Sequence, residues 1–376
     1  HNIEAFGGFS AEGYRREILG GESSLFENEA LRFYSLGVGK NKTIFSGLTE
    51  WGLQSYIGRF QYSFREEYTF SFAGRADASS RFYSDLEYFP TVSLLWNPSN
   101  RAFVQDSRFL STLLFRFSYG ITGNQEIEPY TTFTLLDEFG AALNGTSING
   151  IGPSQIGNTS LEMEKTSQLN LGIAIGFLSN RFQLDLDFYT SKTDNALLLE
   201  PLPGTAGYPV AISNGASISN SGIEFSINGV TSYSNLTWNF GFNLGFNKNT
   251  INTLPNQTSI TTGPELQSVS DWRILQTGMS VGSWYGFLSD GLVASGENPP
   301  GFAGQNLQPG DQKYMDINAD GIINAGDKVV IGDAMPELSY GLYNRFTYKA
   351  LDFSFFFQGM AGHDVANFNN LFLSDP

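Results

Sequence analysis

The chain has 376 residues, a formal net charge of −16 and no cysteine. So acidic a chain argues against a nucleic-acid partner, which requires a basic face, and the lack of thiols excludes disulfide bridges and thiolate metal sites. With only two histidines, His1 and His363, a histidine-based catalytic triad or zinc site is nearly ruled out. Abundant Phe, Tyr and Gly are typical of aromatic strands joined by polar turns.

Apolar residues alternate with polar or small ones in many segments, which is the pattern of a β-strand with two different faces. From 238 to 246, for example, Trp, Phe and Leu alternate with Asn and Gly. Strands are predicted at 56–64, 68–72, 113–119, 168–177, 182–188, 223–227, 238–247 and 353–357. The pattern predicts an all-β, antiparallel fold.

Two features favour a transmembrane β-barrel over a soluble sandwich. Asp185 and Asp187 lie on the polar face of one strand without an obvious counter-charge, which suits a water-filled lumen and is costly in a packed core. The connections also alternate in length. Those at 64–68, 177–182, 227–238 and 348–353 are short, whereas 190–221 and 247–336 are long. Short turns at one end and long loops at the other are typical of outer-membrane barrels.

Length and strand pattern also predict the size of the barrel. We expect about a dozen to fourteen membrane-spanning strands. Because a barrel leaves no edge exposed to lipid, these strands either close on themselves or belong to a larger barrel. The strand-like beginning, HNIEAFGGFS, favours a portion of a larger one. Aromatic girdles at the membrane surfaces would include Phe82, Tyr83, Tyr88, Phe89 and Trp96.

The segment from 311 to 333 carries the most specific local chemistry. Oxygen-bearing groups fall at positions 1, 3, 5, 7, 9 and 12 of a calcium-binding loop, around Gly321 at its sharp turn. These predicted ligands are Asp316, Asn318, Asp320, Ile322 through its carbonyl, Asn324 and Asp327. Asp327 replaces the usual bidentate Glu, which weakens the site. The ion would be structural, and the alternative is an Asx-rich turn that binds nothing.

Aromatic residues near this segment are candidate substrate contacts. Trp272, Trp284 and Tyr285 would stack on the apolar face of a sugar or on a peptide side chain. The alternative, which we favour, is that they pack the base of the loop. No residue is nominated as catalytic, because no ordered acid, base or nucleophile constellation is present.

Several short motifs in fixed order resemble one family. RADASSRF at 75–82, FPTVSLLW at 89–96 and LFRFSYGITGN at 114–124 are similar to successive signatures of SusC-like TonB-dependent transporters (the SusC/RagA family). LEMEKT at 161–166, FYTSKTD at 188–194 and NSGIE at 220–224 look like its later strands. The calcium-loop-like segment is similar to a late loop of that family.

This resemblance implies a function. Members are barrels of about 22 strands in the Gram-negative outer membrane that import oligosaccharides or peptides, powered by the TonB complex, with a SusD-like surface lipoprotein as a lid. Residues 1–376 would form one incomplete barrel portion, with 311–333 as an extracellular segment and the plug domain outside this chain. We expect no enzymatic activity. The alternatives are a siderophore-type receptor and a soluble calcium-dependent β-sandwich adhesin or lectin.

Overall fold

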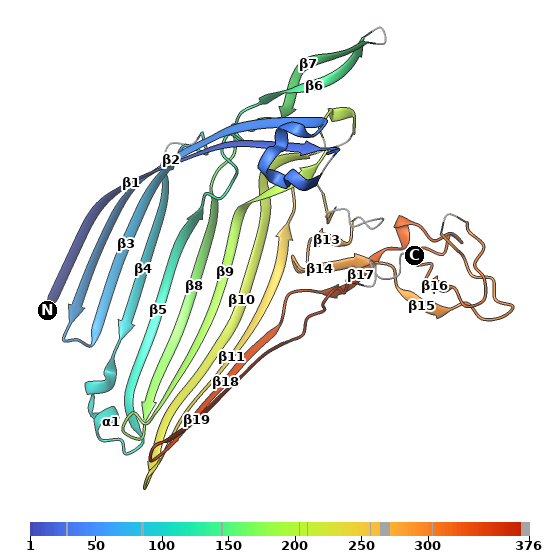
Figure 1. The fold of residues 1–376 in the computed structure, drawn as a ribbon. Helices are drawn as coiled ribbons and strands as arrows, with labels where there is room; N and C mark the ends of the chain where they lie inside the picture. The colour runs from blue at the N-terminus through green and yellow to red at the C-terminus, as the bar shows by residue number, and fades with distance from the viewer. Residues whose placement is uncertain are drawn as a thin grey trace.

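A single antiparallel sheet of long strands dominates the described part of the computed structural model (Figure 1). The structure describes residues 1–27, 29–83, 86–143, 146–202, 204–208, 210–255, 257–263, 271–302 and 304–369. In these residues the sheet has eleven strands in the order β1-β2-β3-β4-β5-β8-β9-β10-β11-β18-β19. Almost every strand therefore pairs with its neighbour in the chain, and the sheet curves like the wall of a wide barrel.

The strands of this main sheet are β1 (Asn2–Ser24), β2 (Asn41–Phe64), β3 (Tyr68–Ser79), β4 (Glu87–Trp96), β5 (Leu110–Asn124), β8 (Glu164–Phe177), β9 (Phe182–Pro201), β10 (Val210–Tyr233), β11 (Leu236–Thr253), β18 (Leu338–Tyr348) and β19 (Leu351–Ala361). The shorter strands are β6 (Leu135–Leu143), β7 (Thr146–Gln155), β12 (Ser259–Thr262), β13 (Arg273–Gln276), β14 (Ser283–Gly286), β15 (Ser289–Leu292), β16 (Gln312–Tyr314) and β17 (Val329–Asp333). The helices are α1 (Ala102–Gln105) and the 3₁₀ helices η1 (Glu29–Val38), η2 (Pro98–Asn100), η3 (Gly204–Ala206) and η4 (Ala325–Asp327).

The register gives the sheet two chemically different faces. One row across β8 to β11 consists of Ile173, Leu186, Phe225 and Leu244. The adjacent row, whose side chains point to the opposite face, consists of Gly172, Asp187, Glu224 and Gly245. We call the polar side the inner face and the apolar side the outer face. The predicted alternation therefore holds across neighbouring strands and confirms the all-β antiparallel barrel architecture.

The connections also follow the prediction, with one correction. Short turns at 65–67, 178–181, 234–235 and 349–350 lie at one end of the sheet. The segment from 190 to 221 is not a long loop, because β9 and β10 continue through most of it and leave only residues 202–209 between them. At about 3.3 Å per residue, the 24 residues of β10 outreach an apolar band roughly 25 Å tall. These strands therefore project beyond the membrane at the long-loop end.

The strand count is lower than expected, at eleven in the main sheet of the described residues. The remaining strands of the described residues lie outside this sheet. β6 and β7 form a separate hairpin, and β12 to β17 belong to small sheets in the long segment between β11 and β18. Within the described residues, β1 and β19 each pair on one side only. No helix in this part of the chain is long and apolar enough to cross a bilayer.

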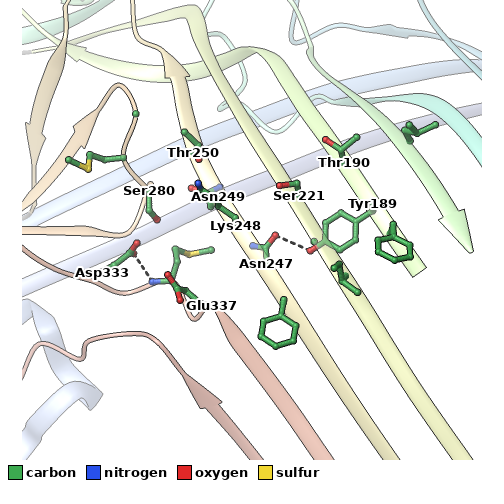
Figure 2. Close-up of a pocket in the computed structure, with 18 of the residues that line it drawn as sticks. Tyr189, Thr190, Ser221, Asn247, Lys248, Asn249, Thr250, Ser280, Asp333 and Glu337 are labelled. Carbon is green, nitrogen blue, oxygen red and sulfur yellow. Dashed lines mark hydrogen bonds between the residues drawn. The ribbon is translucent and has the colours of Figure 1, made fainter. Parts of the chain in front are cut away.

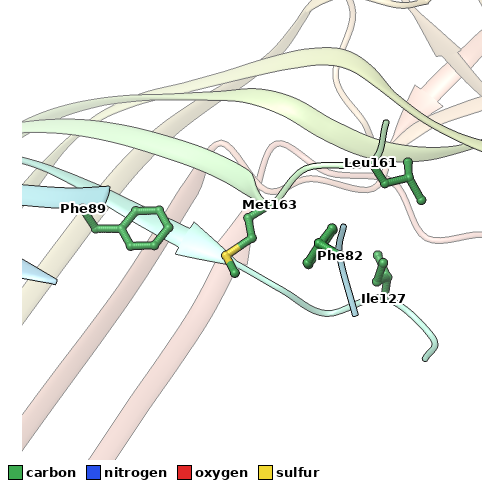
Figure 3. Close-up of a cluster of buried hydrophobic side chains, with 5 residues drawn as sticks. All are labelled: Phe82, Phe89, Ile127, Leu161 and Met163. Atoms are coloured by element: carbon green, nitrogen blue, oxygen red, sulfur yellow. The ribbon is translucent and has the colours of Figure 1, made fainter. Parts of the chain in front are cut away.

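A buried apolar cluster ties the upper connections together (Figure 3). It consists of Phe82, Phe89, Ile127, Leu161 and Met163. Phe82 and Phe89 were expected in an aromatic girdle, and this expectation is wrong, because both are less than a tenth exposed. Phe89 shares the inner face with the polar row of β4, where these connections cover it. Tyr83 and Tyr88, by contrast, are largely exposed.

Candidate functional site

An ion-pair network lies on the inner face. The guanidinium of Arg116 on β5 contacts two carboxylates on β9, with Nη1 3.2 Å from an Asp185 oxygen and Nη2 2.9 Å from an Asp187 oxygen. The expectation that these two aspartates lack a counter-charge is therefore wrong. The partner was missed because it is 69 residues away from Asp185 in the sequence, and only the strand order brings the two together.

Gly172 makes this contact possible. It lies on β8, between Arg116 of β5 and Asp187 of β9 in the same register row. A Cβ atom at this position would be 2.2 Å from an Asp187 oxygen and 2.8 Å from Nε of Arg116. Since no side chain fills the space, the guanidinium passes over β8 to reach β9.

A groove of about 530 Å³ surrounds this network. Its lining includes the hydroxyls and amides of Ser93, Ser118, Gln168, Asn170 and Tyr189, together with Asp187 and Glu224. Tyr189 donates a hydrogen bond of 2.9 Å to the side chain of Asn247 on β11. Such a surface offers many weak donors and acceptors to a polar solute. It has the composition of a passage wall, and no residue in it is paired as a nucleophile with a base.

The predicted calcium segment is a tight loop between β16 and β17. Asp316 accepts the backbone N–H of Gly321 at 2.8 Å, and Asp320 accepts that of Ile322 at 2.9 Å. Gly321 has φ +84°, a left-handed conformation that glycine adopts without strain. Ile323 is buried and bridges to Phe302. The first half of the segment therefore turns as the predicted spacing requires.

Asp327, the last predicted ligand, accepts hydrogen bonds from the backbone of its own loop. Its side chain is fully buried, one oxygen accepts the N–H of Ile317 at 2.9 Å, and the other accepts that of Asn324 at 2.8 Å. These backbone donors, chiefly that of Asn324, lower the pKa of the Asp327 carboxyl below its ordinary value. Ionised Asp327 closes the loop by itself, which makes it the weakest fit to the predicted ligand set. Within the described residues, no three Asp, Glu or His side chains are arranged to hold a metal ion.

The candidate aromatic contacts pack at the base of the same loop. The rings of Trp272 and Trp284 stack with centroids 5.5 Å apart, and Phe368 lies edge-on to Trp272 at 4.9 Å. The indole N–H of Trp284 donates to the carbonyl of Asp364 at 2.9 Å. Tyr285 faces the ammonium of Lys328. These contacts account for the rings as packing elements, and substrate binding by them stays a prediction.

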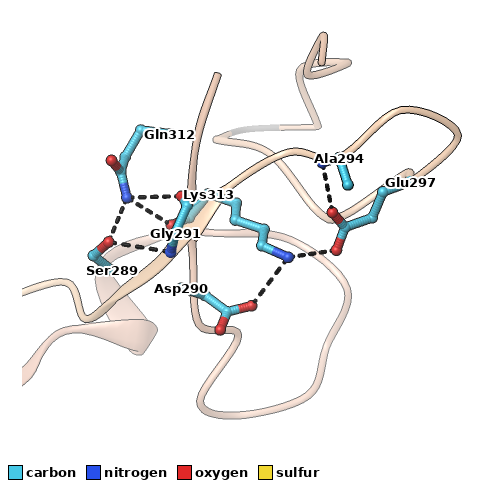
Figure 4. Close-up of polar contacts among 7 residues, drawn as sticks. All are labelled: Ser289, Asp290, Gly291, Ala294, Glu297, Gln312 and Lys313. Atoms are coloured by element: carbon cyan, nitrogen blue, oxygen red, sulfur yellow. Dashed lines mark hydrogen bonds and ion pairs between the residues drawn. The ribbon is translucent and has the colours of Figure 1, made fainter. Parts of the chain in front are cut away.

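Ion pairs and hydrogen bonds connect β15, β16 and the segment between them in the long loop (Figure 4). Lys313 of β16, whose side chain is only 15% exposed, pairs with Glu297 and lies 3.6 Å from Asp290. Glu297 also accepts the N–H of Ala294 at 2.8 Å. Both contacts lower the pKa of the Glu297 carboxyl, the backbone bond more than Lys313. The loop is thus pre-shaped by buried and half-buried polar contacts.

Comparison with known proteins identifies the fold. The model of the family "TonB dependent receptor-like, beta-barrel" matches residues 17–358. The chain belongs to this family. It is a portion of an outer-membrane TonB-dependent receptor barrel, and its membership of a receptor family agrees with the expectation that it is not an enzyme.

Individual relatives support the SusC-like character of the receptor. TonB-dependent receptor P3 of Formosa agariphila is 33% identical over 380 residues, covering 99% of this chain and 38% of the relative. TonB-dependent receptor SusC of Bacteroides thetaiotaomicron is 30% identical over 319 residues, covering 81% of this chain and 30% of the relative. The chain therefore spans only about a third of the length of these receptors.

Solved structures show the same fold. The structure of the RagAB peptide transporter superposes on this receptor portion with a TM-score of 0.80 and 24% identity, covering 96% of this chain and 39% of that one. Its "open-open" state matches with a TM-score of 0.78. The predicted resemblance to SusC/RagA-type receptors is confirmed, as is placement in the outer membrane.

Proposed function

We propose that the receptor containing this chain imports oligosaccharides or peptides across the outer membrane, with a SusD-like lipoprotein as its lid and the TonB complex as its energy source. The observation that carries the proposal is the contrast between the two faces. The inner face presents the Arg116 network and a groove of hydroxyls and amides, whereas the outer face is apolar. Because each contact along the inner face is weak, a bound solute can leave one contact for the next and so pass through the barrel.

The comparisons support the peptide class, because the RagAB peptide transporter and peptide importer share the fold. The oligosaccharide class rests on the resemblance to SusC-like transporters, of which SusC is a sequence relative. Peptides and oligosaccharides both carry dense hydrogen-bonding groups, which match the donors and acceptors of the groove. The complexes named RagAB also support a second protein at the extracellular mouth, where the long loops of this chain lie.

Single cysteines on adjacent residues of β10 test the passage. In the full-length receptor with any other cysteine replaced, the Ser226→Cys variant, on the inner face, should react with a charged, bulky thiol reagent. The labelled variant should then take up fluorescent oligosaccharide or oligopeptide at least about fivefold more slowly than the unlabelled variant. Phe225→Cys, on the lipid side, should react little, because hydrocarbon excludes the charged reagent.

Substrate in excess should slow labelling of Ser226→Cys. Unchanged uptake after complete labelling of this variant would contradict a passage along the inner face. If the unmodified receptor, assembled with its lid protein, took up neither probe, the proposed solute classes would be contradicted. The conclusion that the chain forms a barrel wall would not be affected.

We also propose that the loop at 316–327 binds calcium through Asp316, Asn318, Asp320, the Ile322 carbonyl and Asn324, with Asp327 closing the turn. The support is the spacing of oxygens around Gly321 and the turn geometry of Asp316 and Asp320. When bound, the ion would offset the mutual repulsion of the carboxylates and part of the ordering cost of the loop, about 1 to 2 kcal/mol per residue.

Chelation tests this metal proposal. In the full-length receptor, calcium should slow protease cleavage within 311–333 at least about tenfold relative to chelator, since an ion that binds only the folded loop reduces its opening. Asp320→Ala should abolish the protection. Asp290→Asn, in the same loop but outside the predicted ligand set, should retain it. Equal cleavage with calcium and with chelator would contradict calcium binding.

A further inference from the structure

The outer face changes abruptly from apolar to polar near the long-loop end. One row contains Leu171, Phe188, Ile223 and Phe246. The row two residues further up contains Leu169, Thr190, Ser221 and Lys248. The next row contains Ser167, Lys192, Ser219 and Thr250. Successive rows on one face are only about 7 Å apart, so this step marks where hydrocarbon gives way to lipid headgroups in the extracellular leaflet.

A hollow of about 780 Å³ lies at this boundary (Figure 2). Its floor is the apolar row, whose Phe188, Ile223 and Phe246 side chains are each at least 40% exposed. One side is formed by the long loop, which attaches to β11 where the N–H of Gly278 donates to the Ile251 carbonyl at 2.8 Å. Met279 and Met335 of the loop complete the apolar part.

Two opposite charges line the hollow above this floor. Lys248 is on β11, and Glu337 is at the loop's return to β18. Both side chains are exposed, and neither forms an ion pair within the described residues. This contrasts with Lys192 one row higher, which pairs with Asp194 at 2.8 Å. A third charge, Asp333, accepts the N–H of Met335 at 2.9 Å and is already engaged.

We propose that this hollow binds a phospholipid of the outer leaflet whose headgroup carries both a phosphate and a primary amine. The acyl chains would lie on the row formed by Leu171, Phe188, Ile223 and Phe246. The Lys248 ammonium would meet the phosphate, the Glu337 carboxylate would meet the amine, and the hydroxyls of Thr190 and Ser221 would donate to phosphate oxygens.

The charge pattern favours this occupant over others. A purely anionic lipid would meet Glu337 and Asp333 unfavourably, and a quaternary amine has no N–H to donate to a carboxylate. A soluble peptide also carries both charges, but it would not cover an apolar floor that faces hydrocarbon. The site is separate from the inner face, so the proposal is independent of what the receptor transports.

Lipid retention by the full-length receptor tests the site. After delipidation in detergent, the receptor is given phosphatidylethanolamine, phosphatidylglycerol or phosphatidylcholine, and bound lipid is counted by native mass spectrometry. Phosphatidylethanolamine should be retained about fivefold better than phosphatidylcholine, the ratio expected for one added charge contact at a membrane surface. Lys248→Ala should remove this preference, and Lys248→Arg should keep it.

Glu337→Gln separates the two contacts, because it should lower retention of phosphatidylethanolamine and leave or raise that of phosphatidylglycerol. Lys42→Ala, which removes an exposed cation on β2 far from the hollow, serves as the matched control and should change nothing. Equal retention of the three lipids, or the same loss in Lys42→Ala as in Lys248→Ala, would overturn the proposal. Unchanged electrophoretic mobility of the folded barrel shows that each variant is folded.

Discussion

A Phe242→Arg substitution should lower the free energy of unfolding of the full-length receptor by about 2 to 4 kcal/mol, the cost of a cation on the lipid side of a barrel near the bilayer midplane. Phe242 lies on the outer face of β11, paired with Ile227 and Leu342, midway between the turn at 234–235 and the polar boundary at Lys248. The urea midpoint of unfolding in lipid vesicles measures the effect.

The adjacent residue provides the control. Asn243→Arg places the same cation on the inner face, where water is available, and should change the free energy of unfolding by no more than about 1 kcal/mol. The two variants differ by one position in sequence and by the face of the sheet. Similar destabilisation by both would show that the apolar face does not meet lipid, and the soluble β-sandwich alternative would regain support.

Gly222→Ala should destabilise the receptor by about 1 to 3 kcal/mol through overpacking. A Cβ atom on this residue of β10 would lie 2.3 Å from the carbonyl oxygen of Phe246 and 2.5 Å from the hydroxyl of Tyr189. The ring of Tyr189 occupies the space above the glycine, so the substitution also disrupts its hydrogen bond to Asn247. The unfolding midpoint in urea again provides the measurement.

Gly74→Ala is the matched control, because a Cβ atom on this β3 residue would have no atom within 4 Å. It should be neutral or slightly stabilising, since alanine restricts the unfolded chain more than glycine does. If Gly74→Ala proved as damaging as Gly222→Ala, the loss would reflect strand glycines in general, and close packing at Gly222 would not be its cause.

Strand positions were predictable from the sequence because alternation is a local property. Trp, Phe and Leu alternate with Asn and Gly along β11, and the two faces follow from the geometry of a strand. The ends of β9 and β10 were not predictable, because the alternation of apolar and polar residues breaks down beyond residue 190: polar residues at 190–195 are followed by a continuous apolar run at 196–199. Strand pairing continues there on backbone hydrogen bonds, which leave no trace in the sequence.

In the candidate sites, too, features set by neighbours in sequence were predictable, whereas features set by strand order were not. The calcium-type spacing around Gly321 depends on neighbours in sequence, and its turn was predicted correctly. The role of Arg116 depends on β8 lying between β5 and β9, a relation set by strand order across a gap of 69 residues. Phe82 and Phe89 were misplaced for a similar reason, because the covering residues Leu161 and Met163 come from a distant connection.

The long loop is attached to the barrel wall largely through main-chain atoms. Gly278 donates to Ile251, Ile251 donates to the carbonyl of Met279, and Asn247 donates to the carbonyl of Glu337. Because these bonds do not depend on side-chain identity, amino-acid replacements in the loop leave its anchorage in place. The loop is therefore suited to engineering: its exposed residues can be exchanged one by one while the barrel wall below it is kept.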